Sequence, residues 1–154
     1  MRWKSIGIHI ARILLIVVIA VALNRIFIPK YVEDNQDGRV TEEFYREKTD
    51  LDVLFFGSST VYNAISPVYL YENYGFSSYV RANASQTLWQ SYYLLEEMLG
   101  YETPKVVVFN VLSMKYGEPQ KEAYNRMAID GMRMSSSKIS AIKASMSDKE
   151  SFAS

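Results

Sequence analysis

The residues best suited to covalent chemistry are the serines of the run Gly57-Ser58-Ser59-Thr60, which directly follows the apolar segment Leu51–Phe56. A serine placed where a buried strand turns into a helix exposes its hydroxyl beside free backbone N–H groups, and such groups can stabilise an oxyanion. Two further polar stretches, residues 81–85 and 112–114, follow the next two apolar segments. Because function gathers at the carboxyl ends of parallel strands, we expect all three stretches to share one edge of a sheet.

Three well-known glycine-rich motifs do not fit this run. An α/β-hydrolase elbow requires a glycine at the position of Val61, and a dinucleotide loop requires one at the position of Ser59. A phosphate loop requires a Gly-Lys pair, which the sequence lacks. The sequence has no Cys and a single His, His9, which excludes thiol catalysis and Cys-ligated zinc. We therefore expect neither a metal nor a cofactor.

The elements that would position these residues alternate along the chain. Short apolar runs predict strands, proline after serine predicts a helix start, and glycine predicts a helix end. The pattern predicts strands at Leu51–Phe56, Ser77–Arg81 and Lys105–Val111, and helices at 41–47 (capped by Thr41), 66–75, 85–100 (capped by Ser85), 120–128 and 137–146. In the longest of these helices, the spacing predicts a buried stripe of Leu88, Tyr92, Leu95 and Leu99, with Glu96 and Glu97 facing solvent. Alternating strands and helices predict an α/β fold with a parallel sheet.

The N-terminus has a different composition from the rest of the chain. Residues 6–28 are mostly apolar, and Ile13–Leu23 is an uninterrupted apolar run of eleven. Arg2 and Lys4 precede it, as in an anchor whose N-terminus is cytoplasmic. We therefore predict a transmembrane signal-anchor helix that contacts the lipid bilayer through residues 6–28 and leaves the C-terminal domain extracellular. The alternative is a secretory signal peptide cleaved after Ala22.

Composition and length limit the remaining possibilities. Of 154 residues, 49% are hydrophobic and 14% aromatic, which excludes a disordered chain. The 17 basic and 17 acidic side chains cancel, which argues against a nucleic-acid binder. We divide the chain into a membrane helix at 1–28, a juxtamembrane connector at 29–50 and an α/β domain at 51–154. The α/β part is short for a doubly wound sheet, so we expect it to be incomplete at its C-terminus.

The segment LDVLFFGSST (residues 51–60) resembles block I of the SGNH (GDSL-type) hydrolases, in particular the membrane-anchored, extracytoplasmic branch of Gram-positive bacteria. The later runs YVRANASQTLWQSYYLLEE, PKVVVFNV and SMKYGEPQKEAYNRM also look like that branch. The resemblance implies a flavodoxin-like parallel sheet with flanking helices. It also implies that Ser59 is the nucleophile and that its own N–H is one oxyanion donor.

The other family blocks match less well. The block II glycine, which supplies the second oxyanion N–H, falls at Ala82, and the neighbouring Asn83 could offer a side-chain amide. The block III asparagine falls near Met114, with Asn110 inside the predicted strand and Asn125 further on as candidates. The Asp-x-x-His block is missing, and His9 lies in the predicted anchor. A serine without a base is a poor nucleophile at neutral pH.

The resemblance therefore implies the N-terminal part of a membrane-anchored serine esterase or O-acyltransferase that acts on an ester-linked acyl group of cell-envelope material. Its partner would be a cell-wall polymer or acylated glycan, and the chain alone would be inactive. The alternative is a non-catalytic, membrane-anchored envelope protein that keeps the sheet for binding or as a scaffold.

Overall fold

The computed structural model describes residues 2–27, 36–47, 50–115 and 121–146. The chain forms two compact units, Met1–Lys30 and Tyr31–Ser154. The predicted connector at 29–50 falls partly on residues 28–35 and 48–49, which lie outside the described residues.

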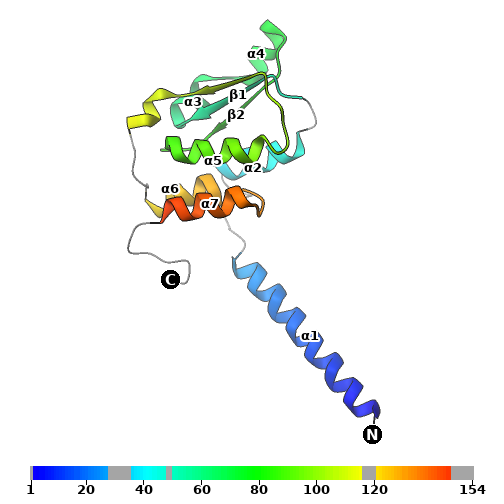
Figure 1. Ribbon diagram of the computed structural model, residues 1–154. Helices are drawn as coiled ribbons and strands as arrows, with labels where there is room; N and C mark the ends of the chain where they lie inside the picture. The colour runs from blue at the N-terminus through cyan, green and yellow to red at the C-terminus, as the bar shows by residue number, and fades with distance from the viewer. Residues whose placement is uncertain (1, 28–35, 48–49, 116–120, 147–154) are drawn as a thin grey trace. The chain divides into compact units, whose positions relative to one another are not determined.

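The first unit is one helix, α1 (Arg2–Phe27) (Figure 1). No helix within the described residues is both long enough and apolar enough to cross a membrane, so the predicted transmembrane helix over residues 1–28 is wrong, and the single-pass topology drawn from it lacks support. The physical reason is the length of the apolar run, because His9 and Arg12 interrupt that run before Ile13. Eleven residues of helix rise only about 16 Å, roughly half of the ~30 Å hydrocarbon core.

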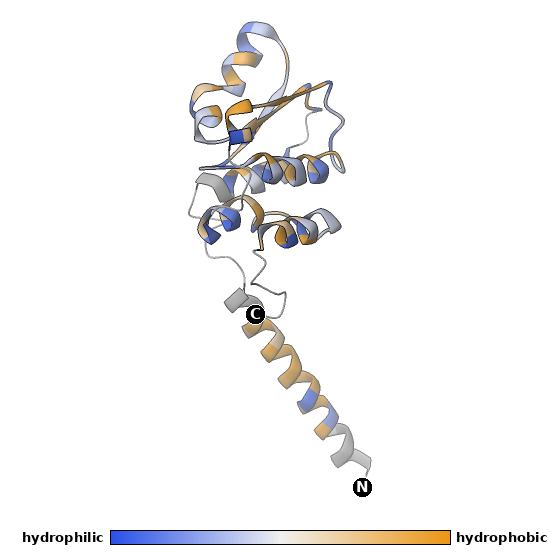
Figure 2. Ribbon diagram, turned by 60° about the vertical axis from the view of Figure 1, so that its left-hand side comes forward, coloured by the Kyte–Doolittle hydropathy of each residue, from blue (hydrophilic) through white to orange (hydrophobic). Residues whose placement is uncertain are grey.

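The second unit is built on a three-stranded parallel sheet in the order β2-β1-β3. Its strands are β1 (Val53–Gly57), β2 (Ser78–Ala82) and β3 (Val106–Phe109), each within two residues of the predicted ends. In register, Gly57 pairs with Ala82 and Phe56 pairs with Phe109. Figure 2 shows orange on the strands of this sheet, in line with the apolar sequences of β1 and β3. The unit is therefore α/β, with a small parallel sheet and surrounding helices.

The chain passes from β1 to β2 through two helices, α3 (Ser59–Ala64) and α4 (Pro67–Tyr74). The second of these was predicted from its ends. The Ser66 side chain accepts a hydrogen bond from the N–H of Tyr69, Pro67 stands in the first turn, and Gly75 ends the helix with φ 75°. The chain then passes from β2 to β3 through α5 (Leu88–Met98).

Two predicted helix starts are wrong. Thr41 is not a cap but lies inside α2 (Gln36–Arg46), where it is 1% exposed. A β-carbon on Gly131 would lie 2.8 Å from the Thr41 side chain, so the helix is held tightly there. Ser85 does not cap α5 either, because Thr87 is the N-cap residue. The N–H of Thr87 donates a hydrogen bond to the Gln90 side chain.

Helices cover one face of the sheet in two layers. In the first layer α2 and α5 contact the strands, and behind them lie α6 (Glu122–Ile129) and α7 (Ser136–Ser145) (Figure 1). The core lies between the sheet and these helices. It includes Phe44, Leu54, Phe56, Leu94, Met98 and Ile129. On the opposite face, α3 and α4 contact β2, whereas Val106 and Val108 of β3 are exposed. The short 3-10 helix η1 (Val111–Lys115) follows β3.

Candidate functional site

The three strand ends meet at one edge of the sheet, as the sequence analysis predicted. Gly57 ends β1 beside Ala82, and the N–H of Asn110 donates to the carbonyl oxygen of Phe56 over 2.9 Å. A β-carbon on Gly57 would lie 2.3 Å from Cγ2 of Val61 and 2.8 Å from Cβ of Asn110. Glycine is therefore required here by close packing, and that packing brings the start of α3 against the residue that follows β3.

Ser59 is the first residue of α3 and is half-buried. The preceding residue, Ser58, has an extended backbone, and its carbonyl oxygen accepts from the N–H of Val61 over 2.9 Å. The hydroxyls of Ser58 and Thr60 lie 3.1 Å apart and share a hydrogen bond. Within the described part of the chain, the Ser59 hydroxyl has no such partner. Its neighbours thus satisfy each other and leave the Ser59 hydroxyl available for chemistry.

Ala82 and Asn83, the expected oxyanion donors of block II, are both buried in the structure. Ala82 is the last residue of β2 and is 2% exposed, while Asn83 is the first residue beyond the strand and is 0% exposed. The Nδ2 of Asn83 donates inward to Oε1 of Gln86 over 2.9 Å, so this amide is already engaged. The Oδ1 of Asn83 is buried and has no hydrogen-bond partner among the described residues. An unpaired buried acceptor of this kind costs about 1–3 kcal/mol.

Gln86 is the centre of a buried amide network that the sequence analysis missed. Besides accepting from Asn83, its Nε2 donates to the Arg81 carbonyl oxygen over 3.2 Å and to the Ser91 hydroxyl over 2.8 Å. Both Gln86 and Ser91 are at most 2% exposed. The network fixes the end of β2 against the first turn of α5.

A second part of the network joins α5 to α6. The Gln90 side chain accepts from the N–H of Thr87 over 2.7 Å and donates to Oδ1 of Asn125 over 2.9 Å. Asn125, one of the block III candidates, therefore lies in the helical layers and not at the strand ends. The only sequence signal for the network was the density of amide and hydroxyl residues between positions 83 and 91.

Ser85 has a left-handed backbone with φ 54°, in the turn closed by the Gln86 N–H donating to the Asn83 carbonyl oxygen over 3.2 Å. For a residue with a side chain this conformation is strained by about 1–2 kcal/mol. Such strain is typical of functional sites, where surrounding contacts force the chain into a set shape.

Asn110 does not lie inside a strand, as the sequence analysis had it, because β3 ends at Phe109. Its Oδ1 accepts from the N–H of Leu112 over 2.8 Å, and its carbonyl oxygen accepts from the Ser113 hydroxyl over 2.6 Å. These bonds begin η1, and they hold Asn110 beside Gly57. Met114, the expected block III position, is 59% exposed in η1. The structure thus brings Asn110, not Met114, to the edge that carries Ser59.

No imidazole is available in the second unit, because His9 belongs to the first. Within the described residues, no three His, Cys, Asp or Glu side chains gather in a way that could hold a metal ion. Two buried titratable groups with shifted pKa, Glu97 on α5 and Lys138 on α7, lie in the helical layers. Burial raises the pKa of Glu97 although the Tyr45 hydroxyl donates to its carboxylate, and burial lowers the pKa of Lys138.

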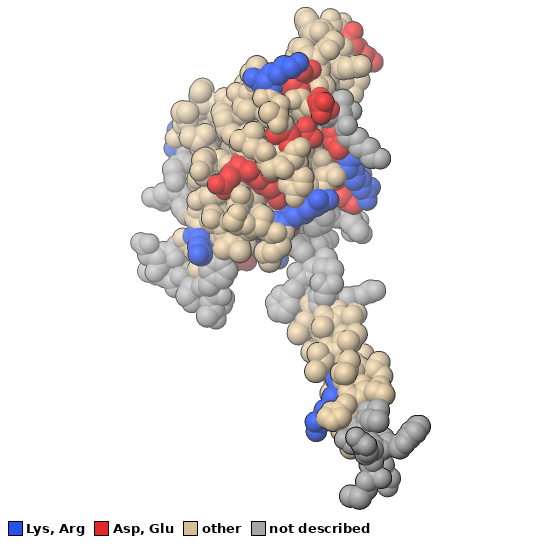
Figure 3. All heavy atoms as spheres, turned by 45° about the vertical axis from the view of Figure 1, so that its right-hand side comes forward, with Lys and Arg blue, Asp and Glu red and all other residues tan. Residues whose placement is uncertain are grey.

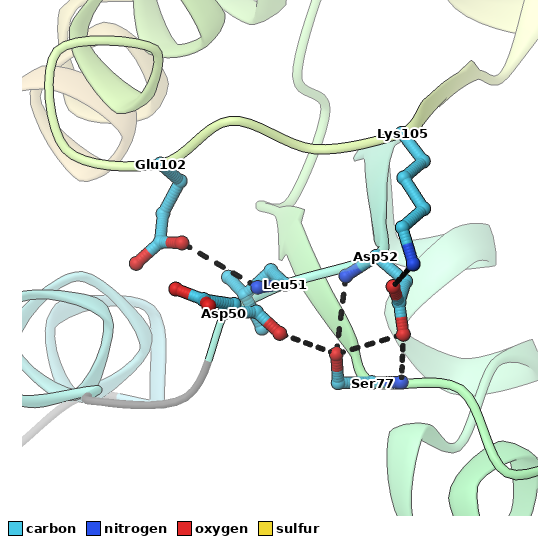
Figure 4. Close-up of polar contacts among 6 residues, drawn as sticks. All are labelled: Asp50, Leu51, Asp52, Ser77, Glu102 and Lys105. Atoms are coloured by element: carbon cyan, nitrogen blue, oxygen red, sulfur yellow. Dashed lines mark hydrogen bonds and ion pairs between the residues drawn. The ribbon is translucent and has the colours of Figure 1, made fainter.

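The opposite, amino-terminal edge of the sheet is also polar, and Asp52, Ser77 and Lys105 bind each other there (Figure 4). The buried Oγ of Ser78, the first residue of β2, has no hydrogen-bond partner among the described residues. The Asp52 carboxylate accepts from the Ser77 N–H over 3.0 Å and pairs with Nζ of Lys105 over 2.6 Å. The Ser77 hydroxyl donates to the Asp50 carbonyl oxygen over 2.6 Å and lies 3.1 Å from the Asp52 N–H. Lys105 and the Ser77 N–H lower the pKa of Asp52.

Comparison of the chain with protein-family models, with curated proteins and with solved structures finds no match.

Proposed function

We propose that the Tyr31–Ser154 unit is the nucleophile-bearing part of an SGNH-like serine esterase or O-acyltransferase that acts on an ester-linked acyl group of cell-envelope material. One observation carries the proposal: Gly57 and Asn110, from the ends of two neighbouring parallel strands, pack closely at the start of the helix that begins with Ser59. This is where an open parallel sheet holds its reacting groups.

In the proposed reaction, the Ser59 Oγ attacks the carbonyl carbon of the ester while a base removes the hydroxyl proton. The bond from that carbon to the alcohol oxygen breaks, the alcohol leaves with a proton, and the acyl group remains on Ser59. Water or an acceptor hydroxyl then takes the acyl group. The backbone N–H of Ser59 and the amide Nδ2 of Asn110 are the donors we assign to the oxyanion, since the Asn83 amide is engaged with Gln86.

Residues 31–154 contain no histidine, so a histidine base, as in the SGNH family, would have to come from outside them. Without it, catalysis is limited to what the oxyanion donors and binding supply, which is about 10³- to 10⁴-fold over water in serine hydrolases stripped of their triad. The absence of histidine from residues 31–154 also favours the second candidate, a non-catalytic binding or scaffold protein of the envelope.

Labelling with a fluorophosphonate at about pH 9.5 separates the two, because hydroxide then replaces the missing base. We expect mass spectrometry of the intact chain to find the adduct on Ser59. Ser66 is the control, because it lies at the start of the neighbouring helix α4 and is more exposed than Ser59. Ser59→Ala should abolish the adduct and Ser66→Ala should leave it unchanged. Equal modification of Ser59 and Ser66 would support the non-catalytic candidate.

A further inference from the structure

The strand β3 forms one edge of the sheet and is covered less than β2, which forms the other edge. Helices α2, α3, α4 and α5 contact β2, whereas Val106 and Val108 of β3 are 50% and 40% exposed. Proteins usually protect an edge strand with charged residues, proline or a covering element. Here Pro104 and Lys105 stand only at the start of the strand, and no charged residue follows until Lys115. An apolar edge of this kind is a template for pairing with another strand.

The hydrogen bonds between β3 and its neighbour show which backbone groups point outward. The N–H of Val106 donates to the carbonyl oxygen of Asp52, which directly precedes β1, over 3.0 Å. Inward and outward residues alternate along a strand, so Val107 and Phe109 direct their N–H and C=O groups away from β1. Among the described residues no strand lies on that side, because β3 ends the sheet. Donors and acceptors at a two-residue spacing are matched by the backbone of another extended strand.

One register matches all four outward groups to those of a second copy of β3. With Val107 opposite Phe109 of the second copy in an antiparallel pair, each residue both donates and accepts. A pair centred on Val107 would instead use Lys105, whose N–H already bonds inward toward β1. A pair centred on Phe109 would use Val111, which lies in the 3-10 helix η1. The two-fold axis of the pair therefore passes through Val108.

The side chains also fit this register. On the exposed face, Val108 lies opposite Val108 of the second copy, and Val106 lies opposite Asn110 of the second copy. Lys105 lies opposite Val111 of the second copy, so no like charges are opposed. The full chain carries no net charge, and Figure 3 shows basic and acidic side chains interspersed over the face in view. Two copies can therefore approach without long-range repulsion.

We propose that the chain forms a symmetric dimer in which the β3 strands of two copies pair antiparallel about Val108. The pair joins the two parallel sheets into one continuous sheet and uses the same surface on both copies, as a two-fold interface requires. Because the strands run in opposite directions, the carboxyl-terminal edges of the two sheets face opposite ways. The dimer requires no reaction at Ser59, so it does not rest on the proposed function.

A single introduced cysteine tests the register in the full chain, because the sequence contains no cysteine. In the proposed dimer the two copies of residue 108 form a non-hydrogen-bonded pair with Cα atoms about 4.5 Å apart, within the range of about 4.4–6.8 Å that a disulfide spans. We expect Val108→Cys to form a disulfide-linked dimer under mild oxidation, measured by mass spectrometry of the intact protein.

Val106→Cys is the matched control, because Val106 lies on the same strand, on the same face and is at least as exposed. In the proposed register its two copies are four residues apart along the strands, about 14 Å, which no disulfide spans. We expect Val108→Cys to cross-link at least tenfold faster than Val106→Cys.

Charged variants measure the association without a covalent bond. Val108→Lys opposes two like charges at the axis and should weaken the dimer at least tenfold in analytical ultracentrifugation, as should Val108→Glu. An equimolar mixture of the two variants should recover the dimer, because opposite charges then meet. Fluorophosphonate labelling of Ser59 should be the same in Val108→Lys as in wild type, so failure of the dimer and failure of the proposed function can be told apart.

The proposal is overturned if the wild-type chain is monomeric at high micromolar concentration, as it would be if only a strand of another protein pairs with β3. It is also overturned if Val106→Cys cross-links as fast as Val108→Cys, or if the mixture of charged variants does not recover the dimer. A dimer that none of the changes at Val108 weakens would be formed by another surface.

Discussion

At the amino-terminal edge of the sheet, Asp52, Ser77 and Lys105 precede the three strands and satisfy one another (Figure 4). At the carboxyl-terminal edge of the same strands, the Oδ1 of Asn83 is buried without a partner among the described residues, and Ser85 holds a left-handed backbone. The amino-terminal edge keeps one unpaired group as well, because the buried Oγ of Ser78, the first residue of β2, has no partner among the described residues. The carboxyl-terminal edge differs in its strained turn at Ser85.

This difference is informative because the two edges share strands, register and core. Each edge keeps one buried oxygen without a partner among the described residues, Oγ of Ser78 at the amino-terminal edge and Oδ1 of Asn83 at the carboxyl-terminal edge. Among the described non-glycine residues, only Ser85, at the carboxyl-terminal edge, has a positive φ. Backbone strain held by surrounding contacts is typical of functional sites, so the turn at Ser85 supports this edge as the site, independently of the resemblance carried by residues 51–60.

The largest expected effect comes from the amide network behind that edge. Gln86→Ala would remove the partners of Asn83 Nδ2, the Arg81 carbonyl oxygen and the Ser91 hydroxyl, all in a buried region. We expect a loss of about 2–4 kcal/mol in the free energy of unfolding, measured by chemical denaturation.

The matched variant at the amino-terminal edge is Ser77→Ala. Its hydroxyl bonds lie in a partly exposed network where water can replace them, so we expect a loss of only about 1 kcal/mol. If Ser77→Ala were as damaging as Gln86→Ala, the two edges would not differ in the way described.

The next effect concerns the close approach at Gly57. In Gly57→Ala, the new methyl group would meet Val61 at 2.3 Å and Asn110 at 2.8 Å, so either α3 or η1 must move. We expect a destabilisation of about 1–3 kcal/mol from overpacking. Adding Val61→Ala should restore only part of the lost stability, because it removes the contact with Cγ2 of Val61 but leaves the contact with Asn110. Gly7→Ala is the control, since nothing lies within 4 Å of its added carbon.

The strand ends and the helix α4 could be predicted from sequence because their signals are local. Apolar runs ended by glycine or serine set the strands, and Ser66, Pro67 and Gly75 set both ends of α4. Predictions that depended on tertiary packing failed. Thr41 and Ser85 have the residue type of a cap, but packing at Gly131 and the turn at Gln86 assign them other roles.

The buried face of α5 shows most clearly why the site was harder to predict. The sequence analysis placed Tyr92 and Leu99 in the core and Glu97 in solvent. In the structure Tyr92 and Leu99 are 57% and 53% exposed, whereas Glu97 is 6% exposed. Polar residues occupy this face because partners distant in sequence satisfy them, as Tyr45 does for Glu97. A hydrophobic period cannot detect a polar network of that kind.

A smaller, pH-dependent effect is expected at the amino-terminal edge. Lys105 and the Ser77 N–H hold the pKa of Asp52 below its usual value. Because the folded pKa is lowered, Asp52 stabilises the fold above its unfolded pKa, near 4, and this stabilisation is lost as the pH falls through the folded pKa. The effect is small since the Lys105 side chain is 80% exposed.

Asp52→Asn should therefore reduce stability at pH 7 and remove the part of the acid sensitivity that appears below about pH 4. Thermal melts of both proteins between pH 2 and pH 7 measure it. Glu72→Gln is the control, an exposed carboxylate on α4 whose removal should leave the acid sensitivity as it is. Identical curves for wild type and Asp52→Asn would mean that the charge of Asp52 does not stabilise this edge.

The smallest effect is expected at Ser85, and its sign is the sharpest test of the comparison. Because Ser85 has φ 54°, removing its side chain should relieve about 1–2 kcal/mol of backbone strain in the folded state. Introducing glycine should cost about 0.5–1 kcal/mol of stability through the entropy of the unfolded chain. Ser85→Gly should thus stabilise the fold slightly, by about 0 to 1.5 kcal/mol. The neighbouring Ala84→Gly, whose φ is not positive, should bring only the entropic loss.

Strain that serves the site should also be visible in reactivity. If the Ser85 turn holds the carboxyl-terminal edge in the shape that the reaction needs, Ser85→Gly gains stability but lowers the selectivity of fluorophosphonate for Ser59 over Ser66, whereas Ala84→Gly loses stability and leaves the selectivity unchanged. A Ser85→Gly variant that is less stable than Ala84→Gly would show that the left-handed turn is not strained. The carboxyl-terminal edge would then not differ from the amino-terminal edge, since each keeps one unpaired oxygen, on Asn83 and on Ser78.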